Sequence, residues 1–474
     1  MDKTASSTTR QKALAINLDA KTYGTFAEIG GGQEVARWFF SVGGAAGTVA
    51  KTISAYDMSV SDSLYGPAKQ YVSRQRLEAM LEQEFAQLLE RLGPARGDIK
   101  TFFAFANTVA TRRYGHPGNG RGWLGVRFQS RPREGPSSII IHAHLFDSTA
   151  DRQQDALGVL GVNLIHGAFL RRASIADLID SLTDELSRER IDVDMIKLTG
   201  PAFASVDNRL LSLQLVERGL TDAAMFRADG EVVQPSEVLY KKPVLVERGS
   251  FRPATNLTLD LLTRALDQFL QEPSVQGQKP VVLAEMTLRS LTADPNVGHE
   301  DFLARAEILG ALGFDVLISR FESYYQLAEY LADYTDGLIG LAVGLPATRQ
   351  IVADERYYTD LPGGVLESVG RLFKRSVKMY VYPTRDPASG EIHTVLQGPI
   401  LPPWHHLRDL LLEIGRVVPI HDYDESLLSI HTPEVLERIQ RQDPTWEAMV
   451  PAVVAEAIKA KGLFGLKSKQ PAYV

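Results

Sequence analysis

Two clusters of glycine near the N-terminus are the residues of this chain best suited to bind an anion. The first, Gly30, Gly31 and Gly32, lies between a strand-like run at 25–29 and a helix-like run at 33–40. Glycines at a helix start leave backbone N–H groups uncovered beside the positive end of the helix dipole, where phosphate binds readily. We therefore predict that this cluster holds an anionic cofactor or substrate. The second cluster and the polar residues after it complete the predicted site: Gly43, Gly44, Gly47, Thr48 and Lys51.

Neither cluster completes a nucleotide-binding fingerprint. The dinucleotide pattern G-x-G-x-x-G begins in the first cluster, but Val35 stands where its third glycine is required. The P-loop pattern fails at Ala50, which stands directly before Lys51 where glycine is required. The spacing of Gly43 and Gly47 also has a structural explanation, because small residues four apart let two helices approach closely. Anion binding and helix packing are both open alternatives.

Charged residues gather where several apolar strands of the second half end. Ligands of open α/β sheets bind outside the carboxyl ends of the strands. Glu285, at the end of the run 280–285, is our candidate for a catalytic base, and Arg320, after the run 314–319, is the second catalytic candidate. Buried structural salt bridges would give the same pattern of Glu and Arg. Four further basic residues are predicted to bind a phosphorylated or carboxylated substrate: Lys241, Lys242, Arg248 and Arg252.

His142 and His144 lie two residues apart in the strand-like run at 137–147. Alternate side chains of a strand point to the same face, so both imidazoles can reach one metal ion. The sequence shows no clear third ligand, however, and two histidines also occur on the polar face of an antiparallel meander. No metal site is therefore predicted, and the sequence does not identify a cofactor.

The composition narrows the classes of function. The chain has 474 residues, a formal net charge of −7 and no cysteine. The acidic balance gives no support to nucleic-acid binding, and the absence of cysteine excludes disulfides, thiolate metal sites and a cysteine nucleophile. The longest uncharged apolar run, 38–50, is shorter than the about 20 residues that cross a bilayer. The N-terminus lacks the apolar segment of a secretory signal, so we expect a cytoplasmic protein without a membrane partner.

The fold class predicted is α/β. From about residue 174 helical patterns alternate with strands that are apolar on both faces, which is typical of a mostly parallel sheet covered by helices. We favour an open, doubly wound sheet over a barrel. Before it, turn residues separate the runs 100–111, 122–130 and 137–147, which predicts an antiparallel meander in an α+β region. The predicted organisation is a flexible leader at 1–22, an α+β domain at 23–170, a parallel-sheet domain at 171–385 and a helical extension at 386–474.

Two runs of the sequence resemble a widespread, uncharacterised bacterial family, and the resemblance covers most of the chain. They are RWFFSVGGAAGT at 37–48 and QPSEVLYKKP at 234–243. Members of that family carry two conflicting labels, TonB-dependent receptor and nicotinate-nucleotide adenylyltransferase. The first label implies a signal peptide and alternating barrel strands, and the second implies an H-x-G-H motif; this sequence has none of these features. No functional residue is carried over from either label.

These observations favour a cytosolic protein that binds a phosphorylated small molecule or a nucleotide, with a transferase as one form that such a protein could take. The partner is then a small anionic metabolite or nucleotide, and neither nucleic acid nor membrane. The alternative is a non-catalytic assembly protein that forms a homo-oligomer through its glycine- and alanine-rich segment and the aromatic run Trp38, Phe39 and Phe40.

Overall fold

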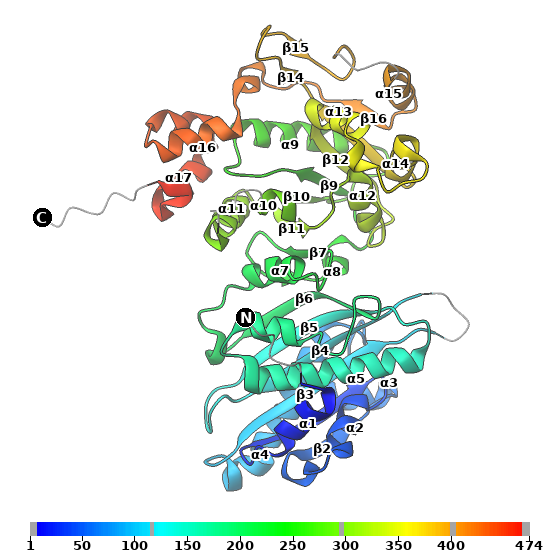
Figure 1. Cartoon of the computed structure of the whole chain (residues 1–474), viewed down its shortest axis with the longest axis vertical. Coiled ribbons are helices and arrows are strands. Elements are labelled where there is room, and N and C mark those ends of the chain that lie inside the picture. Colours follow the sequence, from blue (N-terminus) through cyan, green and yellow to red (C-terminus); the bar gives the residue numbers. More distant parts are fainter. Residues whose placement is uncertain (1–6, 114–117, 293–297, 399–403, 467–474) are drawn as a thin grey trace, which may run out of the picture. The chain divides into compact units, whose positions relative to one another are not determined.

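The chain consists of two compact units. The computed structural model describes residues 7–113, 118–292, 298–398 and 404–466, and contacts divide the chain into Met1–Thr221 and Asp222–Val474 (Figure 1). The sequence placed this division at 170/171 instead. The difference arises because β6 (Ile191–Thr199) hydrogen-bonds antiparallel to β5 (Ser137–Leu145) and so completes the sheet of the first unit.

The first unit is built on a six-stranded mixed sheet with the order β2-β1-β3-β4-β5-β6. The first three strands are parallel, and β3 to β6 form an antiparallel meander. The meander predicted from turn residues is thus confirmed and gains β6. The strands not yet bounded are β1 (Thr22–Ile29), β2 (Val49–Ile53), β3 (Thr101–Ala110) and β4 (Gly120–Phe128).

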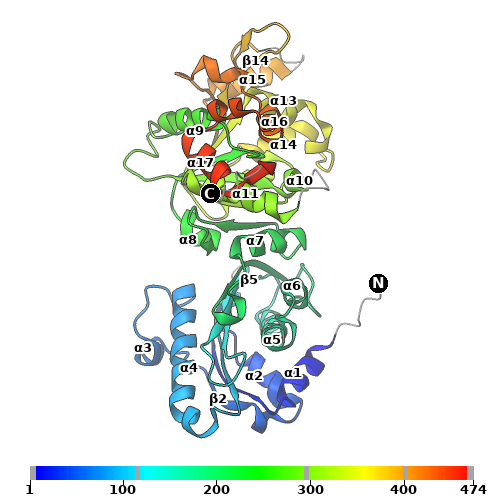
Figure 2. The same ribbon diagram turned by 90° about the vertical axis from the view of Figure 1, so that its left-hand side faces the viewer.

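Helices cover both faces of this sheet (Figure 2). Helices α1 (Thr9–Asn17), α2 (Glu34–Ser41) and α5 (Ala150–His166) bury apolar residues against one face, together with α6 (Ile175–Ser181) and α7 (Asn208–Glu217). On the other face lies α4 (Arg74–Arg96), whose Phe85 and Leu88 pack on Phe102 and Ala104 of β3, beside α3 (Met58–Tyr65). Alternation along β3 explains this division, because Phe103 and Phe105 belong to the core of the opposite face.

The predicted flexible leader contains a packed helix. Residues 1–6 lie outside the described part of the chain, but α1 begins at Thr9 with a capping box in which Thr8 accepts from the backbone N–H of Gln11. Lys12 is buried and donates from Nζ to Oδ1 of Asn163 at 2.7 Å, and it also pairs with Asp184. The polar composition of this segment gave no indication of these partners, because they are distant in the sequence.

The second unit is an open, doubly wound α/β domain, as predicted. Its sheet has the order β16-β13-β12-β9-β10-β11-β7-β8, in which the six strands from β16 to β11 are parallel and β7 and β8 form an antiparallel edge. The strands are β7 (Ala223–Phe226), β8 (Val232–Val233), β9 (Val244–Arg248), β10 (Val281–Thr287), β11 (Asp315–Ser319), β12 (Ile339–Gly344), β13 (Val377–Tyr382) and β16 (Val417–Pro419).

Helices again lie on both faces of this second sheet. Helices α12 (Tyr324–Ala332), α13 (Leu345–Ala353) and α14 (Gly364–Leu372) share one core with β9, β12 and β13, while α9 (Asn256–Phe269) packs on the opposite face. The chain runs from β9 to β10 and β11, then returns to place β12 on the other side of β9. That reversal is the switch point at which open α/β sheets bind ligands. The remaining elements are α8 (Pro235–Leu239), α10 (Leu288–Leu291), α11 (His299–Ala311) and the two-stranded β14 (Thr384–Arg385) and β15 (Ile392–His393).

The segment predicted as a helical extension belongs to the second unit. It contains α15 (Trp404–Glu413), α16 (Thr432–Gln440) and α17 (Ala452–Lys461), but β16 between them pairs with β13 and joins the main sheet. Within the described residues, none of the helices combines the length and apolar character that a bilayer-crossing segment needs.

Candidate functional site

A cavity of about 560 Å³ opens at the carboxyl ends of β9, β10 and β11. We call it the arginine cavity. The residues come from the segments that follow these three strands and from α13 and the turn after it, so the switch point of the sheet brings them together. Its lining comprises Arg248, Thr287, Leu288, Arg289, Thr292, Arg320, Phe321, Glu322, Gln350, Asp354, Arg356 and Tyr357.

Arg248 is held in place by a buried carboxylate. Its Nε and Nη2 donate to the two carboxylate oxygens of Glu285 at 2.7 and 2.9 Å, and its guanidinium lies 4.6 Å from the ring centre of Tyr324. Ser319 donates to Glu285 at 2.6 Å. Burial lowers the pKa of Arg248, but the Glu285 carboxylate outweighs burial and the net direction is upward. Arg248 is therefore a fixed cation at the cavity wall.

Two other arginines of the cavity are engaged in no close pairing, although Arg289 has a longer-range charge interaction with Asp354. Across the described part of the chain, the side chains of Arg289 and Arg320 make neither a hydrogen bond nor an ion pair, and both are exposed. Arg356, in contrast, donates to Asp354 at 2.8 Å and is already neutralised. The cavity thus presents two cations that are available for an anionic ligand.

The structure brings together some of the residues predicted at the strand ends and separates others. Arg248 and Arg320 both line the cavity, and Glu285 lies directly behind Arg248. Lys241 and Lys242 precede β9 and so lie at the amino edge of the sheet, away from this cavity. The predicted substrate role of these two lysines therefore has no support from their position.

Glu285 and Arg252 have different surroundings from those the sequence suggested. Glu285 is fully buried and both of its oxygens accept hydrogen bonds, so its geometry fits a residue that orients Arg248 better than a catalytic base. Arg252 donates to Asp301 of α11 at 2.7 Å. Sequence reasoning missed Arg289 and Arg356. Arg289 could have been found from its place two residues after β10, whereas Arg356 is distant in sequence from any strand end.

The first glycine cluster lies between β1 and α2, where Gly30 packs closely against the backbone of β3. Glu28, at the end of β1, accepts from the N–H groups of Val35 at 3.2 Å and Ala36 at 2.9 Å, so the chain's own carboxylate caps the start of α2. Burial raises the pKa of Glu28 to about 7. Gly30 has a φ of +88°, and a Cβ there would lie 1.9 Å from the carbonyl oxygen of Val109. Ligand binding by Gly30, Gly31 and Gly32 stays a prediction.

The second cluster forms the connection from α2 to β2. Asn17 donates to the carbonyl oxygen of Gly43 at 2.7 Å, while Gly44 has a φ of +76° and Gly47 is exposed. Thr48 is buried, and Lys51 pairs with the buried Glu84 at 2.6 Å. Lys51 is thus occupied by a carboxylate of its own unit. The predicted role of this cluster in binding phosphate is untested, and the predicted helix packing is not seen because the segment is a turn.

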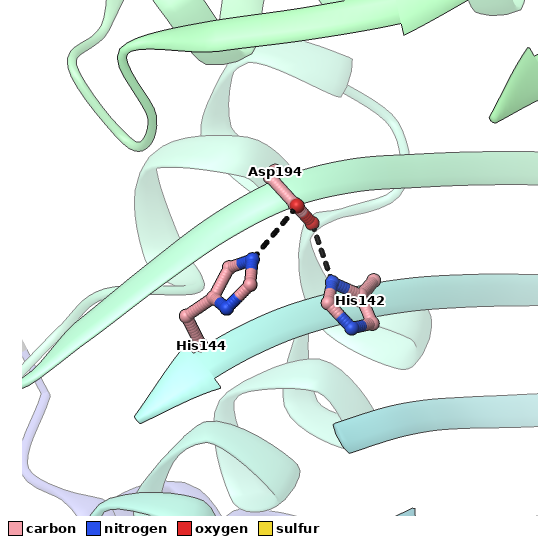
Figure 3. A group of neighbouring side chains, drawn as sticks. All are labelled: His142, His144 and Asp194. Carbon is pink, nitrogen blue, oxygen red and sulfur yellow. Dashed lines mark hydrogen bonds and ion pairs between the residues drawn. The ribbon is translucent and has the colours of Figure 1, made fainter. Parts of the chain in front are cut away.

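A third polar group lies on the sheet of the first unit, where His142 and His144 meet Asp194 of β6 (Figure 3). Nδ1 of His142 lies 2.6 Å from one oxygen of Asp194, and Nε2 of His144 lies 3.1 Å from the other. Burial raises the pKa of Asp194, but the two imidazoles outweigh it and the pKa lies well below its usual range. Burial lowers the pKa of His144, which the Asp194 charge reverses to a net rise. Asp194 is the third partner that the sequence did not reveal.

Comparisons with known proteins give fold likenesses at low similarity. No protein-family model matches the chain, and no curated protein matches it. A competence/damage inducible protein from Agrobacterium tumefaciens is 16% identical, with 33% of this chain and 93% of that chain covered and a TM-score of 0.25. A competence-damaged protein superfamily member from Enterobacter cloacae is 12% identical, with 35% and 96% covered and a TM-score of 0.26. A putative nicotinate-nucleotide adenylyltransferase from Vibrio parahaemolyticus is 10% identical, with 48% and 97% covered and a TM-score of 0.20. No function of this chain follows from matches of this size.

Proposed function

We propose that this protein binds a phosphorylated small molecule or nucleotide in the arginine cavity. The observation that carries the proposal is the pair of exposed guanidinium groups of Arg289 and Arg320, which make no hydrogen bond or ion pair within the described residues, beside the fixed cation Arg248. Planar guanidinium groups pair with phosphate through two parallel N–H donors, which makes arginine the preferred side chain for this anion. Four arginines line the cavity with two acidic residues, and Glu285 behind Arg248 is a third, so the balance stays positive.

The shape and position of the cavity support the same ligand class. Its volume of about 560 Å³ lies within the roughly 300–1,000 Å³ typical of sites for small molecules and cofactors. Thr287 and Tyr357 add hydroxyl groups to the lining, and Phe321 adds an aromatic ring. The cationic groups thus suit a phosphate, and the less polar part of the wall suits the group that carries it. Transfer of a group from this ligand is the reaction class that we predicted, and it stays a prediction, as does a cytoplasmic location.

Isothermal titration calorimetry of the full chain tests this proposal. We expect ATP and pyrophosphate to bind at 0.15 M salt, adenosine to bind more weakly, and the R289A and R320A variants to lose affinity for both anions. K242A is the matched control, because it removes an exposed positive charge at the opposite edge of the sheet. The proposal would be rejected if neither ATP nor pyrophosphate bound at millimolar concentration. It would also be rejected if K242A lost as much affinity as R289A and R320A.

The homo-oligomer is kept as a second candidate because of one side chain. Phe40 is 54% exposed, whereas its neighbour Phe39 is buried in the core. An exposed aromatic beside the open turn at 43–47 is a surface that a second copy could cover. Light scattering after size-exclusion chromatography tests it: the candidate requires an oligomer that F40S dissociates, and a monomeric wild-type chain would eliminate it.

A further inference from the structure

We propose that His142, His144 and Asp194 form a binding site for one divalent transition-metal ion. The three side chains come from two neighbouring antiparallel strands, and their ligand atoms all lie within 4.8 Å of one another. Figure 3 shows both rings turning a nitrogen toward the same carboxylate. Two imidazole nitrogens and one carboxylate oxygen form the donor set that zinc, iron, cobalt and nickel accept.

The pairing of β5 with β6 places the carboxylate beside the histidines, next to an irregularity in the register. Between β5 and β6, His142 is paired with Met195 but the next residue, Ala143, is paired with Val193. Asp194 and Met195 are therefore the two residues of a β-bulge. Bulges redirect a side chain and are frequent beside functional sites. Continued from the pairs His144–Asp192 and Ala143–Val193, the register places Asp194 on the same face as both histidines, and the bulge adds Met195 opposite His142.

A second carboxylate lies beside the three ligands. Asp192 is directly opposite His144 in the strand register. Its Oδ1 is buried and has no hydrogen-bond partner within the described residues. A buried carboxylate oxygen without a partner is costly, and a cation or a metal-bound water would satisfy it. Asp192 is outside the cluster of three ligands, so it would contact the ion through a bound water.

The dimensions of the cluster suit an ion after local adjustment of the side chains. In a tetrahedral site with bonds of about 2.1 Å, two ligand atoms of one ion lie roughly 3.4 Å apart. The three ligand atoms lie within 4.8 Å of one another, so the most distant pair needs to approach by at most about 1.4 Å. His142 and Asp194 are almost fully buried, whereas the His144 side chain is 22% exposed. The His144 side thus gives the ion a route from solvent.

The test is titration of the metal-free full chain, without a histidine tag, with Co²⁺ and Zn²⁺. We expect one Co²⁺ per chain, with visible absorption bands of a site that contains nitrogen ligands, and displacement of Co²⁺ by Zn²⁺. H144Q and D194N should each weaken binding at least about 100-fold, more than the about 10–100-fold typical of outer-shell changes. H144Q is the more informative variant, because its partly exposed position tolerates substitution better than the buried Asp194.

Two controls separate this site from adventitious binding and from simple unfolding. His405 and His406 of α15, whose ring centres lie 3.8 Å apart, are the competing histidine pair, so H405Q/H406Q should leave the stoichiometric site intact. Trp123 lies 4.8 Å from the His142 ring, so Co²⁺ should quench its fluorescence, and W123F should remove that quenching while the ion still binds. Binding that is unchanged in H144Q and D194N, or lost in H405Q/H406Q, overturns the proposal. So does the absence of binding at 1 mM Co²⁺, which would leave a hydrogen-bonded His–Asp–His group.

Discussion

Arg248 and Glu285 are cross-strand neighbours on β9 and β10, and each satisfies the buried charge of the other. Breaking such a buried pair costs about 3–5 kcal/mol, because the remaining charge is left without compensation. We expect Glu285→Gln to lower the free energy of unfolding by about 3 kcal/mol, measured by urea denaturation. Glu322→Gln, an exposed acid of the same cavity, is the control and should change stability by less than about 0.5 kcal/mol. Equal effects of the two changes would show that the pair is not important for stability.

Arg289 and Arg320 should matter for ligand and little for the fold. A hydrogen bond to a charged group contributes about 1.5–3 kcal/mol, so each alanine variant should weaken pyrophosphate binding by about 10-fold or more. Because neither side chain makes a hydrogen bond or ion pair in the described structure, the free energy of unfolding without ligand should stay within about 0.5 kcal/mol of wild type. Calorimetry and urea denaturation of the same samples check both statements. A variant that is destabilised but still binds normally would contradict them.

Glu28 should be essential for the start of α2. Its carboxylate accepts from two helix N–H groups and from Nδ2 of Asn107 at 3.0 Å. Glu28→Gln places an amide NH₂ among donors, so we expect a loss of about 2 kcal/mol at pH 8. Glu34→Gln is the control within the first turn of the same helix and should cost much less. Thermal unfolding by circular dichroism measures both, and a neutral Glu28→Gln would show that the cap is dispensable.

The buried carboxyl of Glu247 should make the protein less stable as pH rises. Burial raises its pKa well above 4.5, and Oε2 has no partner within the described residues. Unfolded chains release this proton near pH 4.5, whereas the folded chain keeps it, so the unfolded state is favoured increasingly above that pH. Glu247→Gln carries no such proton. Urea denaturation at pH 4.5 and pH 8 should therefore show the variant gaining stability relative to wild type at the higher pH. The prediction would be contradicted if variant and wild type differed by the same free energy of unfolding at both pH values.

Gly30 and Gly43 offer a matched test of what the glycine clusters do. Both have positive φ, +88° and +85°, but a Cβ on Gly30 would collide with the carbonyl of Val109, whereas one on Gly43 meets open space. Gly43→Ala should cost only the left-handed backbone penalty of about 1–2 kcal/mol. Gly30→Ala should cost more than about 3 kcal/mol, since the backbone must also move. If urea denaturation shows that Gly30→Ala and Gly43→Ala lose similar amounts of stability, the result would argue against a packing role for the first cluster.

Local patterns predicted most elements correctly. The antiparallel meander within 100–147 and the parallel strands of the second unit are both present. These features depend on residues a few positions apart, which is the range that a sequence pattern records. The prediction of a flexible leader at 1–22 was wrong, because the partners of Lys12 lie more than 150 residues away in the sequence.

The sites depended more strongly on tertiary structure. Strand-end reasoning found Arg248 and Arg320, because the carboxyl ends of parallel strands lie at one edge of a sheet whatever their order. It could not separate Arg320, which is free for a ligand, from Arg252, which is engaged by Asp301. Asp194 was invisible as a partner of His142, because the register between two strands is a property of how they pair.

The amino-acid sequence by itself determined the α/β class, the positions of the strands and the set of charged side chains at their ends, since hydrophobic periodicity and turn residues act locally. Tertiary structure alone decided that β6 completes the first sheet, that β12 returns beside β9 to create the switch point, and which charges neutralise one another. The physical reason is that strand pairing and the desolvation of charges depend on contacts between segments distant along the chain, and the order of residues records those contacts only indirectly.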